Sequence, residues 1–207
     1  MKVIKPYTQI IGEINGQEIL KKIELIGRTC YKSEDRITEE SAEKFVAGLI
    51  KRGHEAMLEH ASITVRFVVD RGISHEIVRH RLASFAQEST RYVNYAKDDG
   101  ITVIMPCFLE EGTDEYNCWR SSCGYAELEY FNLISCGVTP EKARSVLPNS
   151  LKTEVVMTAN LREWRHFFKL RASNTTGKAH PQMLEVTRPL LDELKQLIPI
   201  VFDDITY

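Results

Sequence analysis

The segment 75–92, HEIVRHRLASFAQESTRY, concentrates side chains that bind anions, among them three arginines. Arg79, His80 and Arg81 are consecutive, so on a helix they point about 100° apart and cannot all lie on one solvated face. Guanidinium groups donate forked hydrogen bonds that match phosphate and carboxylate oxygens. Loop hydroxyls and backbone N–H groups can complete such a site. The segment therefore predicts an anion-binding site; the alternative is that Arg79 simply pairs with Glu76 at the surface.

A second basic segment covers residues 160–171, NLREWRHFFKLR. Arg162 and His166 are four residues apart, so they share one face of a helix. The apolar residues of the segment repeat with the spacing of a helix that packs on a core: Leu161, Trp164, Phe167, Phe168 and Leu170. A helix whose polar face is simply basic is the alternative interpretation. Arg144, shortly before Pro148, is a third basic candidate.

Histidine and glutamate occur together at residues 54–60, HEAMLEH. A catalytic zinc helix needs His-Glu-x-x-His, because histidines four residues apart lie on one face. His54 and His60 have four residues between the Glu and the second His, and His75 and His80 are five apart. Neither pair has the required spacing, so we expect no metal site.

The common nucleotide-binding loops are missing from this sequence. None of the 11 glycines forms a G-x-G pair, which excludes a Rossmann fingerprint. The Gly177-Lys178 pair lacks the earlier glycine of a Walker loop. A formal net charge of −2 provides no global basic field, so we expect no nucleic-acid partner. Any bound nucleotide must therefore be held by other residues.

Length and composition predict a globular protein that is either one sizeable domain or two tightly merged lobes, and we expect a single domain over residues 1–207. Hydrophobic residues make up 43% and charged residues 27%, which is ordinary for such a protein. No apolar run approaches the roughly 18 residues of a membrane span, and the start of the chain lacks a signal peptide. We therefore expect a cytoplasmic protein without membrane contact. Its five cysteines, without a C-x-x-C motif, are expected to be reduced thiols.

Local patterns predict a mixed α and β chain. Strands are expected over 7–14, 62–70 and 151–159. Helices are expected over 17–31, 39–52, 75–83, 114–135, 140–148 and 161–171, and from 181 onward. The expected N-caps are Thr38, Ser74, Thr139 and Asn160, the last with Glu163 as its capping-box partner. Residues 84–95 and 173–180 are expected to be loops, and 98–112 a mobile loop.

Arg79-His80-Arg81, followed after seven residues by Ser89, resembles the R-H-R-x7-S signature of the flavin-dependent thymidylate synthases. Further blocks resemble the same family in the same order along the chain: Gly53-His54-Glu55, Thr90-Arg91-Tyr92, Ala143-Arg144 and Asn160-Leu161-Arg162. Together the blocks and the segments between them extend over roughly residues 17–195. The family's fold is a mixed α/β domain with a central, mostly antiparallel sheet flanked by long helices.

The resemblance implies a reductive methylation of dUMP to dTMP. Methylenetetrahydrofolate gives the carbon, NAD(P)H reduces FAD, and no protein nucleophile is required. By position, the residues that resemble flavin contacts are His54, Arg79, His80, Arg81, Gln87, Asn160, Leu161, Arg162 and His166. The resemblance further implies a homotetramer with active sites shared between subunits.

The residues that resemble dUMP contacts are Glu76, Arg79, Gln87, Glu88, Ser89, Thr90, Arg91, Arg144 and Arg171. Arg171 resembles the catalytic arginine that polarises the uracil ring. Glu76 stands where some relatives have Gln, and the 173–180 loop, with His180, is longer than in some relatives. Two other functions stay open: a nucleotide- or nucleic-acid-binding module that keeps the arginines without the chemistry, and a related flavoenzyme that methylates another pyrimidine.

Overall fold

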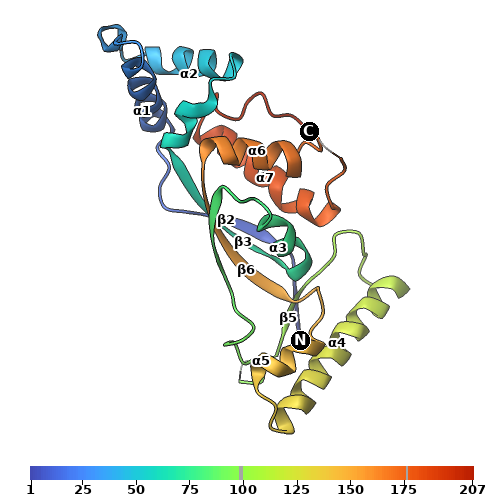
Figure 1. Ribbon diagram of the computed structural model, residues 1–207. Coiled ribbons are helices and arrows are strands. Elements are labelled where there is room, and N and C mark those ends of the chain that lie inside the picture. Colours follow the sequence, from blue (N-terminus) through green and yellow to red (C-terminus); the bar gives the residue numbers. More distant parts are fainter. Residues whose placement is uncertain (98–99, 176) are drawn as a thin grey trace. The chain divides into compact units, whose positions relative to one another are not determined.

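The computed structural model describes residues 1–97, 100–175 and 177–207 (Figure 1). Its strands are β1 (Lys2–Ile4), β2 (Tyr7–Ile11), β3 (Ser62–Asp70), β4 (Ala83–Gln87), β5 (Thr102–Ile104) and β6 (Lys152–Asn160). Its α-helices are α1 (Gly16–Thr29), α2 (Ser41–Lys51), α3 (Arg71–Ile77), α4 (Asp114–Ser135), α5 (Pro140–Ala143), α6 (Leu161–Arg171) and α7 (Pro181–Leu197). Short 3-10 helices are η1 (Glu34–Arg36), η2 (Glu55–His60) and η3 (Arg144–Val146).

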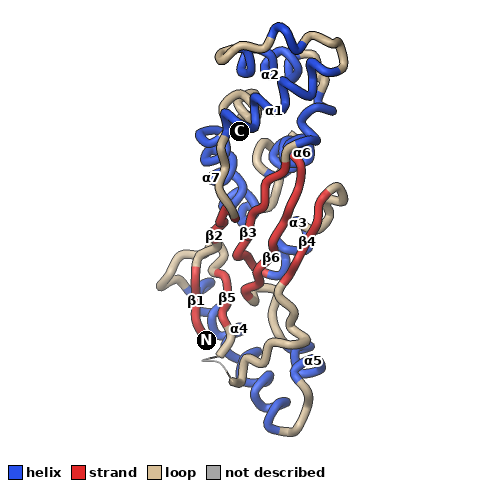
Figure 2. Tube along the Cα trace, turned by 90° about the vertical axis from the view of Figure 1, so that its left-hand side faces the viewer, coloured by secondary structure: helices blue, strands red, loops and turns tan. Residues whose placement is uncertain are grey.

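Two sheets organise these strands (Figure 2). The larger sheet is antiparallel and has the order β2-β3-β6-β4. The smaller sheet pairs β1 with β5 in parallel, with Val3 opposite Val103. Along β3 the side chains of Ile63, Val65 and Phe67 are all buried, as their alternation predicts. The expected mixed α/β fold with a mostly antiparallel sheet is confirmed.

The chain divides into two compact units. One consists of residues 1–8, 66–79 and 85–156, and the other of residues 9–65, 80–84 and 157–207. Strands β2, β3, β4 and β6 each contribute residues to both units. The expectation of a single domain stays a prediction. Among the residues that the structure describes, no helix is long and apolar enough to cross a membrane.

The core of the first unit lies around α4 and β5. Tyr130 and Cys123 of α4 pack with Val103 of β5 and with Leu151, all almost fully buried. Gly137, with φ of +84°, follows the C-cap of α4 in a left-handed conformation that suits glycine, as the sequence predicts for a helix end.

The core of the second unit is aromatic and is built largely by α6. Trp164 stacks on Phe168 at 5.7 Å between ring centroids, and Phe168 meets Phe202 edge to face. The Trp164 indole N–H donates to the backbone oxygen of Ile63, which satisfies a buried polar group. Helix α6 packs on α7 (Figure 1). One face of α6 therefore packs in the core, and its opposite face is free to form part of a binding site.

The structure corrects the expectations for residues 70–95. The helix predicted over 75–83 with Ser74 as its cap is wrong, because Asp70 Oδ1 accepts the Ile73 N–H at 2.8 Å and starts α3 at Arg71. The loop predicted from residue 84 is partly wrong, because β4 extends to Gln87 and joins the sheet beside β6. The β4 segment lacks β-branched residues, so its pattern gave no strand signal.

Smaller differences occur elsewhere. Helix α2 begins at Ser41, and Thr38 does not cap it; the Thr38 N–H instead donates to the Ser41 hydroxyl at 2.9 Å. Strand β5 lies inside the segment predicted to be a mobile loop, of which residues 98–99 lie outside the described residues. Residue 176, in the predicted 173–180 loop, also lies outside them. The long helix α4 matches its predicted bounds.

Candidate active site

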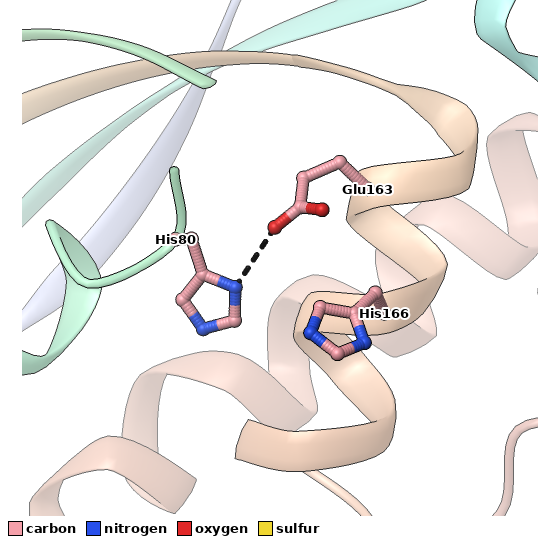
Figure 3. A group of neighbouring side chains, drawn as sticks. All are labelled: His80, Glu163 and His166. Atoms are coloured by element: carbon pink, nitrogen blue, oxygen red, sulfur yellow. Dashed lines mark hydrogen bonds and ion pairs between the residues drawn. The ribbon is translucent and has the colours of Figure 1, made fainter. Parts of the chain in front are cut away.

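A buried group of polar side chains lies in the second unit (Figure 3). His80, between α3 and β4, is 5% exposed. Its Nδ1 lies 3.0 Å from Oε1 of Glu163, a residue in the first turn of α6. Arg171, the last residue of α6, donates from Nε to His80 Nε2 at 3.3 Å. The structure therefore joins two predicted site residues, His80 and Arg171, that are 91 positions apart.

The local fold explains why α6 presents these groups. Asn160 ends β6 and caps α6, because its Oδ1 accepts the Glu163 N–H at 2.9 Å. The aromatic residues of α6 are buried, so Arg162 and His166 lie on the opposite, exposed face. The predicted cap at Asn160 and the shared face of Arg162 and His166 are both confirmed.

This face of α6 borders a cavity of about 680 Å³. Its lining residues are Glu55, Glu59, Leu82, Asn160, Arg162, Glu163, His166 and Lys169. The lining mixes basic and acidic groups, and Arg162 Nη1 lies 2.6 Å from Glu59 Oε1. A cavity of this size falls within the range of small-molecule and cofactor sites. Three of the residues that resemble flavin contacts, Asn160, Arg162 and His166, lie together here.

Other predicted flavin residues have different surroundings. Leu161 is fully buried and its N–H donates to the Ala61 carbonyl, so its side chain belongs to the core. His54 and Arg81 are exposed and do not line this cavity. Arg79 is exposed at the end of α3, in the first unit.

The environment of His80 favours its neutral form. Burial lowers the pKa of His80 below its ordinary value. The hydrogen bond to Glu163 acts in the opposite direction, while the positive charge of Arg171 lowers the pKa further. His166 also lies close, with its ring centroid 5.7 Å from that of His80. The net effect is an uncharged imidazole near neutral pH.

The same residues form a group that resembles a metal site. Ligand atoms of His80, Glu163 and His166 all lie within 4.8 Å of one another. Both ring nitrogens of His80 are nevertheless engaged, one with Glu163 and the other with the Arg171 guanidinium. A cation would have to displace a positively charged donor from Nε2, so the group is better described as a hydrogen-bonded network.

A second cavity, of about 240 Å³, lies in the first unit. It is lined by Arg71, His75, Thr90, Arg144, Ser145, Leu147, Pro148, Asn149 and Leu151. Arg144 donates from Nη1 to the Thr90 hydroxyl at 2.9 Å. This lining contains two arginines and a histidine but no carboxylate. Such a set of donors suits a phosphate group.

Arg71 and His75 were not among the predicted site residues. They are four residues apart on α3 and therefore share a face. They were not predicted to share a helix face, because the expected helix began at His75 and left Arg71 in a turn. The capping pattern of Asp70 before Arg71-Gly72-Ile73 is the signal that identifies the earlier helix start.

The remaining predicted substrate residues are held by neighbours within the first unit. Gln87 donates from Nε2 to the hydroxyls of Ser74 at 3.0 Å and Thr153 at 3.3 Å. Glu88 accepts from Lys152 Nζ at 2.9 Å. The Ser89 hydroxyl accepts the backbone N–H of Arg91, which shapes the turn after β4. Glu76 is half-buried on α3, and the Arg91 side chain is exposed, 3.9 Å from Glu141.

Comparison with known proteins decides the family. Residues 14–200 match the model of the Thy1 family, described as thymidylate synthase complementing protein. The chain belongs to this family. The flavin-dependent thymidylate synthase of Pyrococcus furiosus is 34% identical over 170 residues, covering 81% of this chain and 68% of that protein. That of Geobacter sulfurreducens is 31% identical over 189 residues, covering 88% of this chain and 80% of that protein. The resemblance to the flavin-dependent thymidylate synthases is confirmed.

The fold of this Thy1 family member has also been seen in a solved structure. The UMP/dUMP methylase PolB from Streptomyces cacaoi, bound with 5-Br dUMP, superposes with a TM-score of 0.80. The match covers 98% of this chain and 96% of that chain, at 22% sequence identity. At that level of identity the likeness establishes the fold.

Proposed function

We propose that this flavin-dependent thymidylate synthase family member converts dUMP to dTMP by reductive methylation. FAD is its cofactor, methylenetetrahydrofolate its carbon donor and NAD(P)H its reductant. The observation that carries the proposal is the convergence of Asn160, Arg162 and His166 on one cavity, with family membership behind it. Residues 1–207 act as one domain in this proposal, since the family match runs through both units.

The residues around the larger cavity fit a flavin. Asn160 and His166 offer donors and acceptors for a heterocyclic edge, and Arg162 and Lys169 offer positive charge for phosphate groups. The acidic lining is largely neutralised by partners: Glu59 by Arg162, and Glu55 by the buried Arg165 at 3.1 Å. When bound, the flavin supplies the hydride for the methylation.

The substrate residues perform a different task. Arg144, with Arg71 and His75, neutralises the phosphate dianion of dUMP by charge-assisted hydrogen bonds. Arg91 and Ser89, in the turn after β4, bind the same phosphate in this proposal. Arg171 stabilises the negative charge that develops on the uracil ring as C5 becomes nucleophilic. No serine or cysteine attacks the substrate in this proposal.

The proposal includes a homotetramer with active sites shared between subunits and a cytoplasmic location. These two points rest on the resemblance. Cross-linking or light scattering of the purified protein measures the assembly directly. A monomer that turns over dUMP at full rate contradicts the shared site.

The deciding experiment uses the purified protein. We expect a flavin absorbance spectrum and release of the C5 hydrogen of dUMP when methylenetetrahydrofolate and NAD(P)H are supplied. Parallel assays with UMP and dCMP separate a thymidylate synthase from a flavoenzyme that acts on another pyrimidine. A colourless protein that takes up no FAD, or one that binds dUMP without forming dTMP, overturns the proposal.

A further inference from the structure

The buried residues Glu163 and His80 form a hydrogen-bonded chain with the half-buried Arg171 (Figure 3 shows its first two members). We infer that Glu163 is a positioning residue: its carboxylate keeps the His80 proton on Nδ1, so that Nε2 can accept the Arg171 N–H and hold the guanidinium in place. The inference rests on the proposed function only for the role of Arg171 toward the uracil ring. Glu163 itself was expected only to complete the cap of α6.

The direction of each hydrogen bond follows from the chemistry of its ends. Arginine has donors and no acceptor, so Arg171 Nε must donate to His80 Nε2, which must be unprotonated. A neutral imidazole then carries its proton on Nδ1, and that N–H donates to Glu163 Oε1 at 3.0 Å. With the proton on Nε2 instead, two donors would face each other across 3.3 Å.

The surroundings favour this one arrangement. Glu163 is 5% exposed, and its place in the first turn of α6 sets its negative charge near the positive end of the helix dipole. The groups that face His80 are Glu163, Arg171 and His166, all from α6, and the Phe167 ring at 4.8 Å. Burial and Arg171 keep His80 neutral, as the chain of donors requires.

Glu163 acts on Arg171 through His80 rather than directly. Both residues belong to α6 and are eight positions apart, which is roughly 12 Å along a helix axis. His80 comes from the segment between α3 and β4 and bridges this separation. Side-chain hydrogen bonds through His80 thus connect the first turn of α6 with its last residue.

Histidine tautomers provide a readout that needs no substrate. In protein labelled with ¹⁵N-histidine, we expect His80 to show a protonated Nδ1 and an unprotonated Nε2, with the signal assigned by its loss in His80→Gln. In Glu163→Leu this pattern should disappear. A wild-type spectrum with the proton on Nε2, or an unchanged pattern in Glu163→Leu, overturns the inference. A wild-type protein that forms no dTMP refutes the proposed function and leaves this test intact.

Kinetics then test the link to Arg171. Glu163→Leu should lower kcat/KM for dUMP by about tenfold to a hundredfold, the scale of a lost hydrogen bond to a charged group. Glu163→Gln keeps an acceptor oxygen but loses the charge, so it should lower kcat/KM less than Glu163→Leu does. The surface control Glu129→Gln on α4 should stay within about threefold of wild type. Bound FAD and the melting temperature are measured for each variant. If Glu163→Leu does not fold, Glu163→Asp, which withdraws the carboxylate from Nδ1, takes its place.

A double-mutant cycle separates positioning from a general structural role. If Glu163 acts through Arg171, Glu163→Leu adds less than about twofold to the loss already caused by Arg171→Ala. If the two losses multiply, Glu163 acts on something other than Arg171 and the inference is wrong.

Discussion

Arg144 and Thr90 are joined by a 2.9 Å hydrogen bond although they are 54 positions apart in the chain. Thr90 is buried, whereas Arg144 is exposed at the start of η3 and also donates from Nε to the Glu141 carbonyl. The hydroxyl therefore fixes one edge of the guanidinium beside Arg71 and His75. A side chain held in this way loses little conformational entropy when an anion binds.

The first prediction concerns this phosphate site. Arg144→Ala should weaken dUMP binding by about tenfold to a hundredfold, as expected for a lost hydrogen bond to a charged group. Calorimetry with 2′-deoxyuridine, which lacks the phosphate, should show no difference between the variant and wild type. Arg120→Ala, at an exposed position on α4, is the matched control. An equal loss of affinity for both ligands would place Arg144 away from the phosphate.

The second prediction separates two roles of Asn160. Both Asn160 and Asn15 cap helices by accepting a backbone N–H, at 2.9 Å and 3.1 Å. Replacing either residue by Ala should reduce the free energy of unfolding by about 1 kcal/mol. Asn160→Ala should in addition weaken FAD binding, because Asn160 lines the larger cavity and Asn15 does not. Flavin fluorescence titration measures the affinity, and equal FAD affinities in the two variants would leave Asn160 with the capping role alone.

Local rules explain the parts of this fold and site that could be predicted. Alternation in β3 and the cap at Asn160 depend on residues a few positions apart, so the sequence displays them directly. The role of Glu163 is not displayed in this way. Its spacing from Asn160 fits a capping box, but its carboxylate forms a hydrogen bond with His80, 83 positions away. No local pattern carries that information.

Strand β4 was not predicted, for a related reason. Ala83–Gln87 has little intrinsic preference for a strand and is extended because it joins the sheet beside β6. The start of α3 was missed because Ser74 also fits a cap, although its hydroxyl in fact donates back to the Arg71 carbonyl at 2.8 Å. Pairing with β6 therefore determined the first case, whereas the local cap at Asp70 determined the second and with it the position of Arg71 on α3.

The third prediction concerns catalysis by Arg171. Arg171→Ala should lower kcat by about a hundredfold or more, the scale of a lost group that stabilises developing charge. Bound FAD should remain, because Arg171 is not among the residues that line the larger cavity. Absorbance at the flavin band and initial rates of dTMP formation measure the two quantities. A rate near that of the surface control Arg36→Ala would remove Arg171 from the chemistry.

The fourth prediction concerns the segment after α7. The buried Arg165 donates to both carboxylate oxygens of Asp204, at 2.6 and 2.7 Å, and to the Val201 carbonyl. The Arg165 hydrogen bonds lower the pKa of Asp204 below its usual value of 3.8. A carboxyl group with a lowered pKa stabilises the folded state above the unfolded pKa, and this contribution is lost as the pH falls through the folded value.

Asp204→Asn removes that titration. Its free energy of unfolding should lie below that of wild type at about pH 6, and the difference should shrink as the pH falls below 3.8 and through the lowered pKa of folded Asp204. The difference at pH 6 should be small, because the Asp204 side chain is 48% exposed. Arg165→Met should cost more, about 3 kcal/mol, since it leaves Glu55 and Asp204 without their buried partner. Chemical denaturation at each pH provides these values, and a difference between wild type and Asp204→Asn that does not change with pH would show that Asp204 is not ion-paired with Arg165 in solution.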